Sequence, residues 1–261
     1  MNLVRTSGSI LASAALLACL AGCSGGTPTS APTASAPTGT ITVFAAASLT
    51  EVFTELATRF EAEHPGTTVQ STFAGSSDLV TQITNGAPAD VFASADEATI
   101  ARLDDAGLVA GSPVDIATNT LRIVVPPANP AGITSFADLA EQGVKTVVCA
   151  PAVPCGAATA AVEEASGVEL RPVSEESSVS DVLGKVASGE ADAGIVYVTD
   201  AEAAGDSVTA IALPEAEGIV NTYPISAVRG SSNPALAAEF LEFVSGDEGL
   251  EVLADAGFGA P

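Results

Sequence analysis

The sequence is poor in basic residues. Its 261 residues include 8 Lys and Arg against 32 Asp and Glu, which gives a formal net charge of −24 at pH 7. Nucleic-acid binding depends on Lys and Arg at the phosphates, so this composition argues against a nucleic-acid partner. It also argues against binding to an anionic membrane surface through charge. We interpret most of the acidic residues as a solvated surface.

Aromatic residues are also scarce. They make up 4% of the chain and Trp is absent, whereas hydrophobic residues as a whole make up 47%. The core must therefore be built from Ala, Val, Leu and Ile, which suits a layered α/β protein. The length is long for one domain and fits two lobes of ordinary size.

The longest apolar run lies near the N-terminus. It extends from Ile10 to Leu20 after Arg5 and is too short to anchor the chain across a bilayer. The run leads into Leu20-Ala21-Gly22-Cys23, which resembles the lipobox of bacterial lipoproteins. We predict a signal peptide at residues 1–22 and a lipid on Cys23, followed by a Pro-, Ser- and Thr-rich tether up to residue 39. A plain cleaved signal peptide is the alternative.

The chain has four cysteines, and two of them remain for the folded body. Cys19 leaves with the signal peptide and Cys23 carries the lipid, so Cys149 and Cys155 are left. In an oxidising compartment we expect this pair to form a disulfide that closes a small loop. A zinc site is the rival interpretation, but His64 is the only histidine and two thiols alone are a poor zinc set. We predict no metal-cation site.

From residue 40 onward, short β-branched runs alternate with stretches of helical periodicity. His64-Pro65-Gly66, Asn85-Gly86 and Gly189 end three of the helices, and Asn233-Pro234 begins another. This alternation predicts an α/β fold with parallel sheets covered by helices on both faces. The expected strands are Ile41–Ala45, Val69–Phe73, Val91–Ala93, Leu121–Val125, Thr146–Cys149, Gly194–Val198, Thr209–Leu213 and Tyr223–Val228.

Four predicted helix starts are rich in small hydrogen-bonding residues. Each offers free backbone N–H groups and the positive end of a helix dipole. In an open α/β sheet, the ends of the strands that precede such helices face the crevice where ligands bind. Together they could cage an oxyanion without any formal positive charge. An ordinary Ser N-cap is the alternative at each position, and spacing alone indicates only a small polar or anionic ligand. The four segments are Ala45–Glu51 with a Ser48-x-x-Glu51 capping box, Phe73–Asp78, Val153–Ala157 and Ser177–Asp181.

Several blocks, in this order along the chain, resemble the signature segments of periplasmic molybdate-binding proteins of ABC importers. The resemblance covers roughly residues 40–261. It implies two doubly wound lobes of the type II periplasmic binding protein fold, joined by a two-strand hinge. Lobe 1 would comprise residues 40–120 plus 226–261, and lobe 2 residues 121–225. The blocks are Ala45–Leu49, Phe73–Ser77, Gly86–Asp96, Val153–Gly156 and Gly194–Tyr197 with Asp200.

The same resemblance implies a set of ligand-binding residues. Ser48 and Ser76 would donate hydroxyl and backbone N–H groups, Cys155 and Val179 backbone N–H groups, and Tyr197 its hydroxyl. The family usually has Ala at the position of Cys155, but a backbone donor does not depend on the side chain. A buried carboxylate would repel a dianion. We therefore expect Asp96, which lies in one of the blocks, to be a helix cap and not a ligand.

The resemblance further implies a monomer that binds molybdate, and tungstate as well, outside the cell membrane. The protein would deliver the anion to a membrane permease and would use no cofactor. A binding protein of the same fold for another tetrahedral oxyanion, such as sulfate, is the alternative. Carboxylate ligands are often clamped by Arg, and none of the four donor segments contains one.

An enzyme is the other class to consider. A serine hydrolase would need a base near Ser48 or Ser76, but His64 sits at the end of a predicted helix beside Pro65 and Gly66. No Gly-x-Ser-x-Gly elbow is present. We therefore predict that the protein is not an enzyme.

Overall fold

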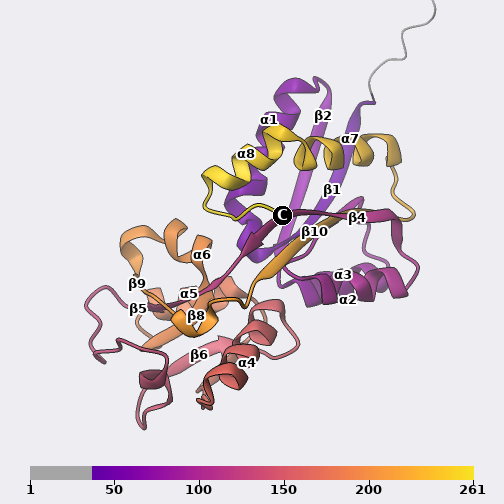
Figure 1. The fold of residues 1–261 in the computed structure, drawn as a ribbon. Coiled ribbons are helices and arrows are strands. Elements are labelled where there is room, and N and C mark those ends of the chain that lie inside the picture. The colour runs from indigo at the N-terminus through magenta and orange to yellow at the C-terminus, as the bar shows by residue number, and fades with distance from the viewer. Residues whose placement is uncertain (1–36) are drawn as a thin grey trace, which may run out of the picture. The chain divides into compact units, whose positions relative to one another are not determined.

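The computed structural model describes residues 37–261, which contain two mixed β-sheets with helices on their faces (Figure 1). The signal peptide, the lipidated Cys23 and most of the tether predicted from the sequence lie outside these residues. Among the described residues, no helix has both the length and the apolar character needed to cross a membrane.

The first sheet has the strand order β2-β1-β3-β10-β4. Strands β2, β1 and β3 are parallel, whereas β10 runs antiparallel to both of its neighbours. We refer to this sheet with its helices as the first lobe. Its strands are β1 (Gly39–Ala46), β2 (Thr67–Ala74), β3 (Val91–Ala93), β4 (Val109–Asn119) and β10 (Asn221–Val228).

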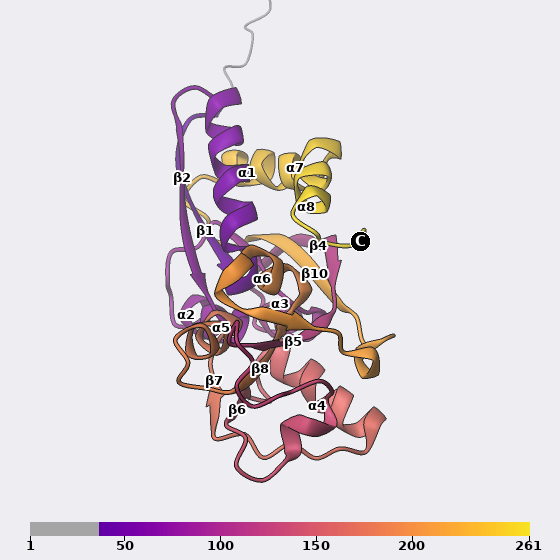
Figure 2. The same cartoon turned by 90° about the vertical axis from the view of Figure 1, so that its left-hand side faces the viewer.

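Helices cover both faces of the first sheet, because alternate residues of its strands point to opposite sides. Ile41 and Val43 pack into the core beneath α1, α7 and α8, whereas Phe44 and Phe92 face the side of α2 and α3. Figure 2 shows α1 alongside β1 and β2, with α7 and α8 next to each other. The helices are α1 (Thr50–Glu63), α2 (Ser76–Thr84), α3 (Glu97–Asp105), α7 (Pro234–Ser245) and α8 (Asp247–Asp255).

The second sheet, which forms the second lobe, repeats this plan. Its order is β7-β6-β8-β5-β9, with β7, β6 and β8 parallel and β5 antiparallel to β8 and β9. The strands are β5 (Leu121–Val125), β6 (Thr146–Cys149), β7 (Ser174–Glu176), β8 (Ala193–Tyr197) and β9 (Thr209–Ile211). The helices are α4 (Pro154–Ser166), α5 (Val179–Ala187) and α6 (Val198–Ala203), with short 3₁₀ turns at Ala137–Ala140, Gly205–Ser207 and Pro214–Ala216. The first lobe has one such turn, at Ala47–Leu49.

The chain crosses between the two sheets twice. It leaves β4 at Asn119 and enters β5 at Leu121, and it returns between β9 and β10. The sequence prediction puts the return between residues 225 and 226, whereas β10 pairs with β4 from Asn221 onward. This pairing moves the boundary ahead of Asn221, and the buried Tyr223 therefore belongs to the first lobe.

All eight predicted strands are present, and the α/β class predicted from the sequence is confirmed. Two strands were missed. Strand β4 contains Gly111 and Pro113, which usually mark loops, but it lies at the edge of its sheet, where Pro is tolerated. Strand β7 has only three residues, which is too few for a periodic pattern.

Candidate functional site

The predicted donor segments meet at the carboxyl ends of parallel strands. Ala46 at the end of β1 lies opposite Ala74 at the end of β2, and Cys149 of β6 lies opposite Glu176 of β7. Each strand is followed within a few residues by the start of a helix or turn. Because parallel strands end at the same edge of a sheet, the helix starts of each lobe gather at that edge.

A small cavity lies between these helix starts. Its volume is about 10 Å³, room for about one water molecule and far below the roughly 300–1,000 Å³ typical of sites for drug-sized molecules. All five ligand residues predicted from the sequence line it, and none of its lining residues is charged. They are Ala46, Ala47, Ser48, Gly75, Ser76, Ala95, Val153, Pro154, Cys155, Val179 and Tyr197.

Backbone N–H groups are available at this cavity. The first residues of a helix have no intrahelical acceptor for their N–H groups. Ser76 is the first residue of α2, Cys155 the second of α4, and Val179 the first of α5. The positive ends of three helix dipoles thus point toward one small volume, which favours a negative ligand.

The hydroxyl of Ser76 is oriented by a neighbour. Its Oγ accepts the backbone N–H of Ala95 at 3.1 Å, and the residue is almost fully buried. A hydroxyl has one hydrogen to donate and two lone pairs to accept with. Since one lone pair is engaged by Ala95, the hydrogen of Ser76 is free to point into the cavity.

Ser48 lies in the 3₁₀ turn before α1 and not at the helix cap. The predicted capping box with Glu51 does not form, because α1 begins two residues later, at Thr50. The Ser48 hydroxyl instead lies 3.0 Å from the hydroxyl of Tyr223 on β10. Tyr223 therefore belongs to the site, although it was not predicted from the sequence. It lies 175 positions from Ser48, and no local motif connects the two.

The hydroxyl of Tyr197 is buried and has no hydrogen-bond partner among residues 37–261. An unpaired buried hydroxyl costs about 1–3 kcal/mol, so it usually has a function. Burial, reinforced by Tyr223 and then by Asp200 and Asp96, raises the pKa of Tyr197 well above its ordinary value. The group therefore stays protonated and is a donor. Its ring meets that of Tyr223 edge to face, with centroids 5.8 Å apart.

Asp200 supports Tyr197 from behind. Its Oδ2 accepts the backbone N–H of Tyr197 at 3.0 Å. Burial raises the pKa of this carboxyl from 3.8 to about 7, and the hydrogen bond from Tyr197 opposes the shift only in part. Asp200 does not line the cavity. Asp200 follows one of the blocks that resemble the family's signature segments, but no role for it was predicted.

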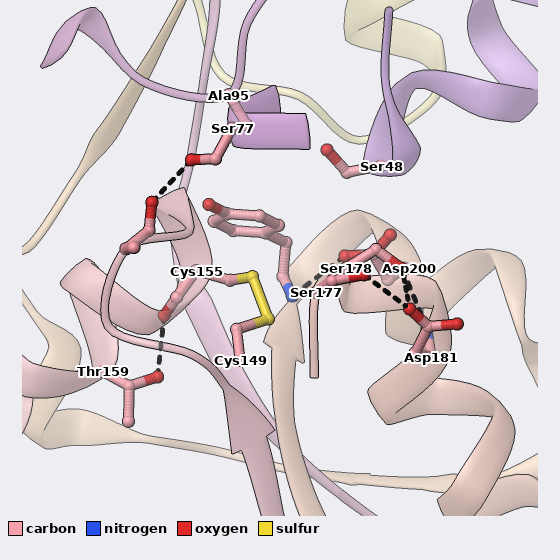
Figure 3. The surroundings of a disulfide bond; sticks show 12 residues. Ser48, Ser77, Ala95, Cys149, Cys155, Thr159, Ser177, Ser178, Asp181 and Asp200 are labelled. Carbon is pink, nitrogen blue, oxygen red and sulfur yellow. Dashed lines mark hydrogen bonds between the residues drawn. A yellow bond between two sulfur atoms is a disulfide. The ribbon is translucent and has the colours of Figure 1, made fainter. Parts of the chain in front are cut away.

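The loop before α4 is closed by a disulfide between Cys149 and Cys155, whose Cα atoms are 5.7 Å apart (Figure 3). The loop turns back tightly on the helix, and a side chain on Gly156 would collide with the carbonyl of Ala150. Within α4, Thr159 donates its hydroxyl to the Cys155 carbonyl at 2.8 Å. The segment that carries the Cys155 N–H is thereby held in one shape.

Two other expectations concern residues near the helix starts. Asp96 caps α3, as predicted, by accepting the N–H of Thr99 at 2.8 Å. Asn233 occupies the cap position of α7 with Pro234 next to it, but its amide donates to the carbonyl of Thr38 instead of capping the helix.

Neither a histidine nor a carboxylate lines the cavity among the described residues. His64 follows α1, where its ring stacks on Phe60 and Nδ1 lies 3.0 Å from the Phe60 carbonyl oxygen. It does not line the cavity. Across residues 37–261, no group of three or more His, Cys, Asp and Glu side chains is placed to hold a metal ion. The chemistry on offer is hydrogen-bond donation to a small ligand.

The fold and this donor-lined cavity define a solute-binding protein of the type II periplasmic class, and comparison with known sequences agrees. A model of the family described as bacterial extracellular solute-binding protein matches residues 41–259. The chain therefore belongs to this family of binding proteins, which are not enzymes. Within the family, it is similar to the molybdate-binding protein ModA of Mycobacterium tuberculosis strain H37Rv. The two are 50% identical over 254 residues, which cover 96% of this chain and 97% of the relative.

Other relatives are more distant. ModA of Escherichia coli strain K12 is 32% identical over 84% of this chain and 89% of its own length. Among solved structures, a periplasmic molybdate-binding protein of Azotobacter vinelandii superposes with a TM-score of 0.72 at 23% identity, over 85% of this chain and 99% of that one. The sulfate-binding protein SubI of M. tuberculosis superposes with a TM-score of 0.74 at 21% identity, over 84% and 86%. These two likenesses show the fold alone.

Proposed function

We propose that this protein captures molybdate outside the cytoplasmic membrane and delivers it to the permease of an ABC importer. The observation that carries the proposal is the buried hydroxyl of Tyr197, which has no hydrogen-bond partner among residues 37–261 and lies beside a cavity that is lined by helix starts and by no charged side chain. The resemblance of the chain to ModA proteins over nearly its whole length supports the choice of ligand.

The residues around the cavity would act as a cage of donors. Ser76 and Tyr197 would each donate a hydroxyl hydrogen, and Cys155 and Val179 their backbone N–H groups. Ser48 would donate its hydrogen to the anion while accepting one from Tyr223, whose hydroxyl lies 3.0 Å away. Hydrogen bonds to a charged partner contribute roughly 1.5–3 kcal/mol each, more than neutral ones. A protein with a net charge of −24 could therefore still hold a dianion in a buried site.

A cage that only donates selects for an anion without a proton. Molybdate and tungstate are fully deprotonated tetrahedral dianions at neutral pH, and we expect both to bind. Monohydrogen phosphate carries a proton that needs an acceptor, and leaving it unpaired costs about 1–3 kcal/mol. The five predicted ligand residues offer their hydroxyl and N–H groups, and no carboxylate lines the cavity to accept that proton.

Sulfate is the second candidate, because it is also a fully deprotonated tetrahedral dianion. A sulfate-binding protein has a similar fold, so this fold is compatible with sulfate as a ligand. Molybdate is larger than sulfate, so cavity size would have to separate them. We favour molybdate because the relatives named for it are similar in sequence, at 50% and 32% identity, whereas the sulfate-binding protein is similar in fold alone.

The remaining features of the proposal concern the state of the protein in the cell. We propose that residues 1–22 direct export, that Cys23 carries a lipid anchor, and that the folded body acts as a monomer. The motif Leu20-Ala21-Gly22-Cys23 supports the anchor. We also propose that the Cys149–Cys155 disulfide is present in the exported protein.

Calorimetric titration of the purified chain with molybdate, tungstate, sulfate and phosphate tests the proposal. We expect tight binding of the first two anions and none of the last two at comparable concentrations. Equal affinity for sulfate would replace the molybdate assignment with the sulfate one. No heat with any of the four would contradict an oxyanion site altogether.

A further inference from the structure

Gly75, the residue before α2, lies against the opposite lobe. It is buried next to Ser76, and a methyl group at its Cα would overlap the carbonyl oxygen of Ser177, which precedes α5. Ser177 belongs to the second lobe and Gly75 to the first. Figure 3 shows Ser48 and Ser77 on one side of this approach, with Ser177 and Ser178 on the other.

The backbone of Gly75 does not itself require glycine. Its φ of −57° and ψ of 134° are open to any L-residue. Gly167, which ends α4 at a φ of 71°, illustrates the opposite case. What excludes a side chain at Gly75 is therefore the contact with Ser177 and not the conformation of its own loop.

The first turn of α2 makes a second contact with the other lobe. The hydroxyl of Ser77 donates to the carbonyl of Ala152 at 2.5 Å. Ala152 lies in the loop closed by Cys149 and Cys155. Residues 75–77 thus touch both the loop that carries the Cys155 N–H and the loop that carries the Val179 N–H.

We propose that Gly75 is a positioning residue for ligand capture, because the absence of a side chain there lets the two lobes approach closely enough for their donors to share one anion. The inference rests on the proposed function, since it assumes an anion held between the lobes. With a Cβ at position 75, the segment Ser177–Val179 would be held away from Ser76. The N–H of Val179 would then lie too far from an anion bound at Ser76 to donate a hydrogen bond to it.

The variant Gly75→Ala tests this role, with Gly184→Ala as the matched control. Gly184 lies within α5, and a methyl group added there meets no atom within 4 Å. We expect Gly75→Ala to weaken molybdate binding at least about tenfold, equivalent to about 1.4 kcal/mol, while Gly184→Ala binds like the wild type. The urea midpoint of ligand-free Gly75→Ala should be no lower than that of the wild type, because Ala fits the backbone and the lobes separate without ligand to make room for the methyl group.

A second readout follows the lobes directly. Small-angle scattering should show a molybdate-induced decrease in radius of gyration for the wild type and Gly184→Ala, and a smaller decrease or none for Gly75→Ala. If Gly75→Ala binds and contracts like the wild type, the positioning role is wrong while the proposed function stands. If Gly75→Ala does not fold, the positioning role is also wrong, because the glycine would then be required for the folding of the first lobe. If the wild type itself does not bind molybdate, the proposed function fails instead.

Discussion

Two hydroxyls at the cavity differ in how the protein uses them. The Oγ of Ser76 accepts the N–H of Ala95, whereas the hydroxyl of Tyr197 has no partner in the described part of the chain. Both are expected to donate to the bound anion. Their removal should therefore have the same effect on binding but opposite effects on the stability of the ligand-free protein.

We predict that Tyr197→Phe weakens molybdate binding by about 1.5–3 kcal/mol, the contribution of a hydrogen bond to a charged group. The free energy of unfolding without ligand should stay the same or rise, because an unpaired buried hydroxyl is removed. Ser76→Ala should weaken binding similarly but lower the free energy of unfolding by about 1–3 kcal/mol, since the Ala95 N–H loses its acceptor. Calorimetry and urea unfolding measure both quantities. A destabilised Tyr197→Phe that binds normally would place its hydroxyl in the fold and not in the site.

Asp200 predicts a pH dependence of stability. Its pKa in the folded protein is about 7, above the ordinary 3.8, because burial disfavours the charged form. The folded state therefore holds a proton that the unfolded state releases between these values. The contribution of Asp200 to stability is fully present below about pH 4 and is lost as the pH rises to 7, by at most about 1.4 kcal/mol per pH unit.

The variant Asp200→Asn should remove this loss while keeping an oxygen that accepts the N–H of Tyr197. Its stability relative to the wild type should rise between pH 4 and pH 7 and level off above pH 7. Urea unfolding across this range measures the difference. A difference that stays constant with pH would mean that the carboxyl titrates alike in both states.

Side-chain roles were predictable from the sequence only where a local motif carries them. The pattern of small residues at helix starts indicated the segments that contain Ser48, Ser76, Cys155 and Val179, and the family resemblance singled out these residues within them. Tyr223 follows no such pattern. Its place beside Ser48 depends on the pairing of β10 with β3 and β4, which brings together residues far apart in the chain.

The disulfide-closed loop joins β6 to α4 and presents the Cys155 N–H to the cavity. We predict that the double variant Cys149→Ser/Cys155→Ser has a free energy of unfolding lower by roughly 2 kcal/mol, because closing so short a loop removes little chain entropy. Molybdate affinity should also fall, since the N–H of Cys155 is no longer fixed. Reductant should have these effects on the wild type and none on the variant. If the wild type keeps its stability and affinity in reductant, and the double variant matches the wild type in both, the bond has no structural role.

Strand β4 shows where reading elements from the sequence fails. The middle of the strand is continuously exposed and contains both Gly111 and Pro113. No alternation of buried and exposed residues therefore marks it as a strand. It is a strand because β10 offers it a buried partner across the sheet. Strands β3, β5 and β6, in contrast, are short and almost wholly buried, and their apolar runs predicted them directly.

The net charge of the protein bears on how the anion arrives. A formal charge of −24 repels a dianion at long range, whereas the cavity holds it through short contacts. Raising the ionic strength from about 0.01 M to 0.15 M shortens the screening length from about 30 Å to 8 Å. We predict that the association rate of molybdate increases over this range, in contrast to the usual case of a cationic site.

Stopped-flow tyrosine fluorescence can follow this rate, since the only two tyrosines, Tyr197 and Tyr223, lie at the site and Trp is absent. The ionic strength is varied with sodium chloride, so that the added anion does not compete with molybdate for the site. An association rate that falls as salt is added would mean that a local positive field outweighs the acidic surface.

The central claim is that neutral donors from both lobes hold one molybdate ion in the cavity between the helix starts. A crystal of the complex, measured on both sides of the molybdenum absorption edge, tests it directly. We predict a single strong anomalous peak in the cavity, with anion oxygens within hydrogen-bonding distance of Ser48, Ser76, Cys155, Val179 and Tyr197. A peak elsewhere on the chain, or none at saturating molybdate, would contradict the claim.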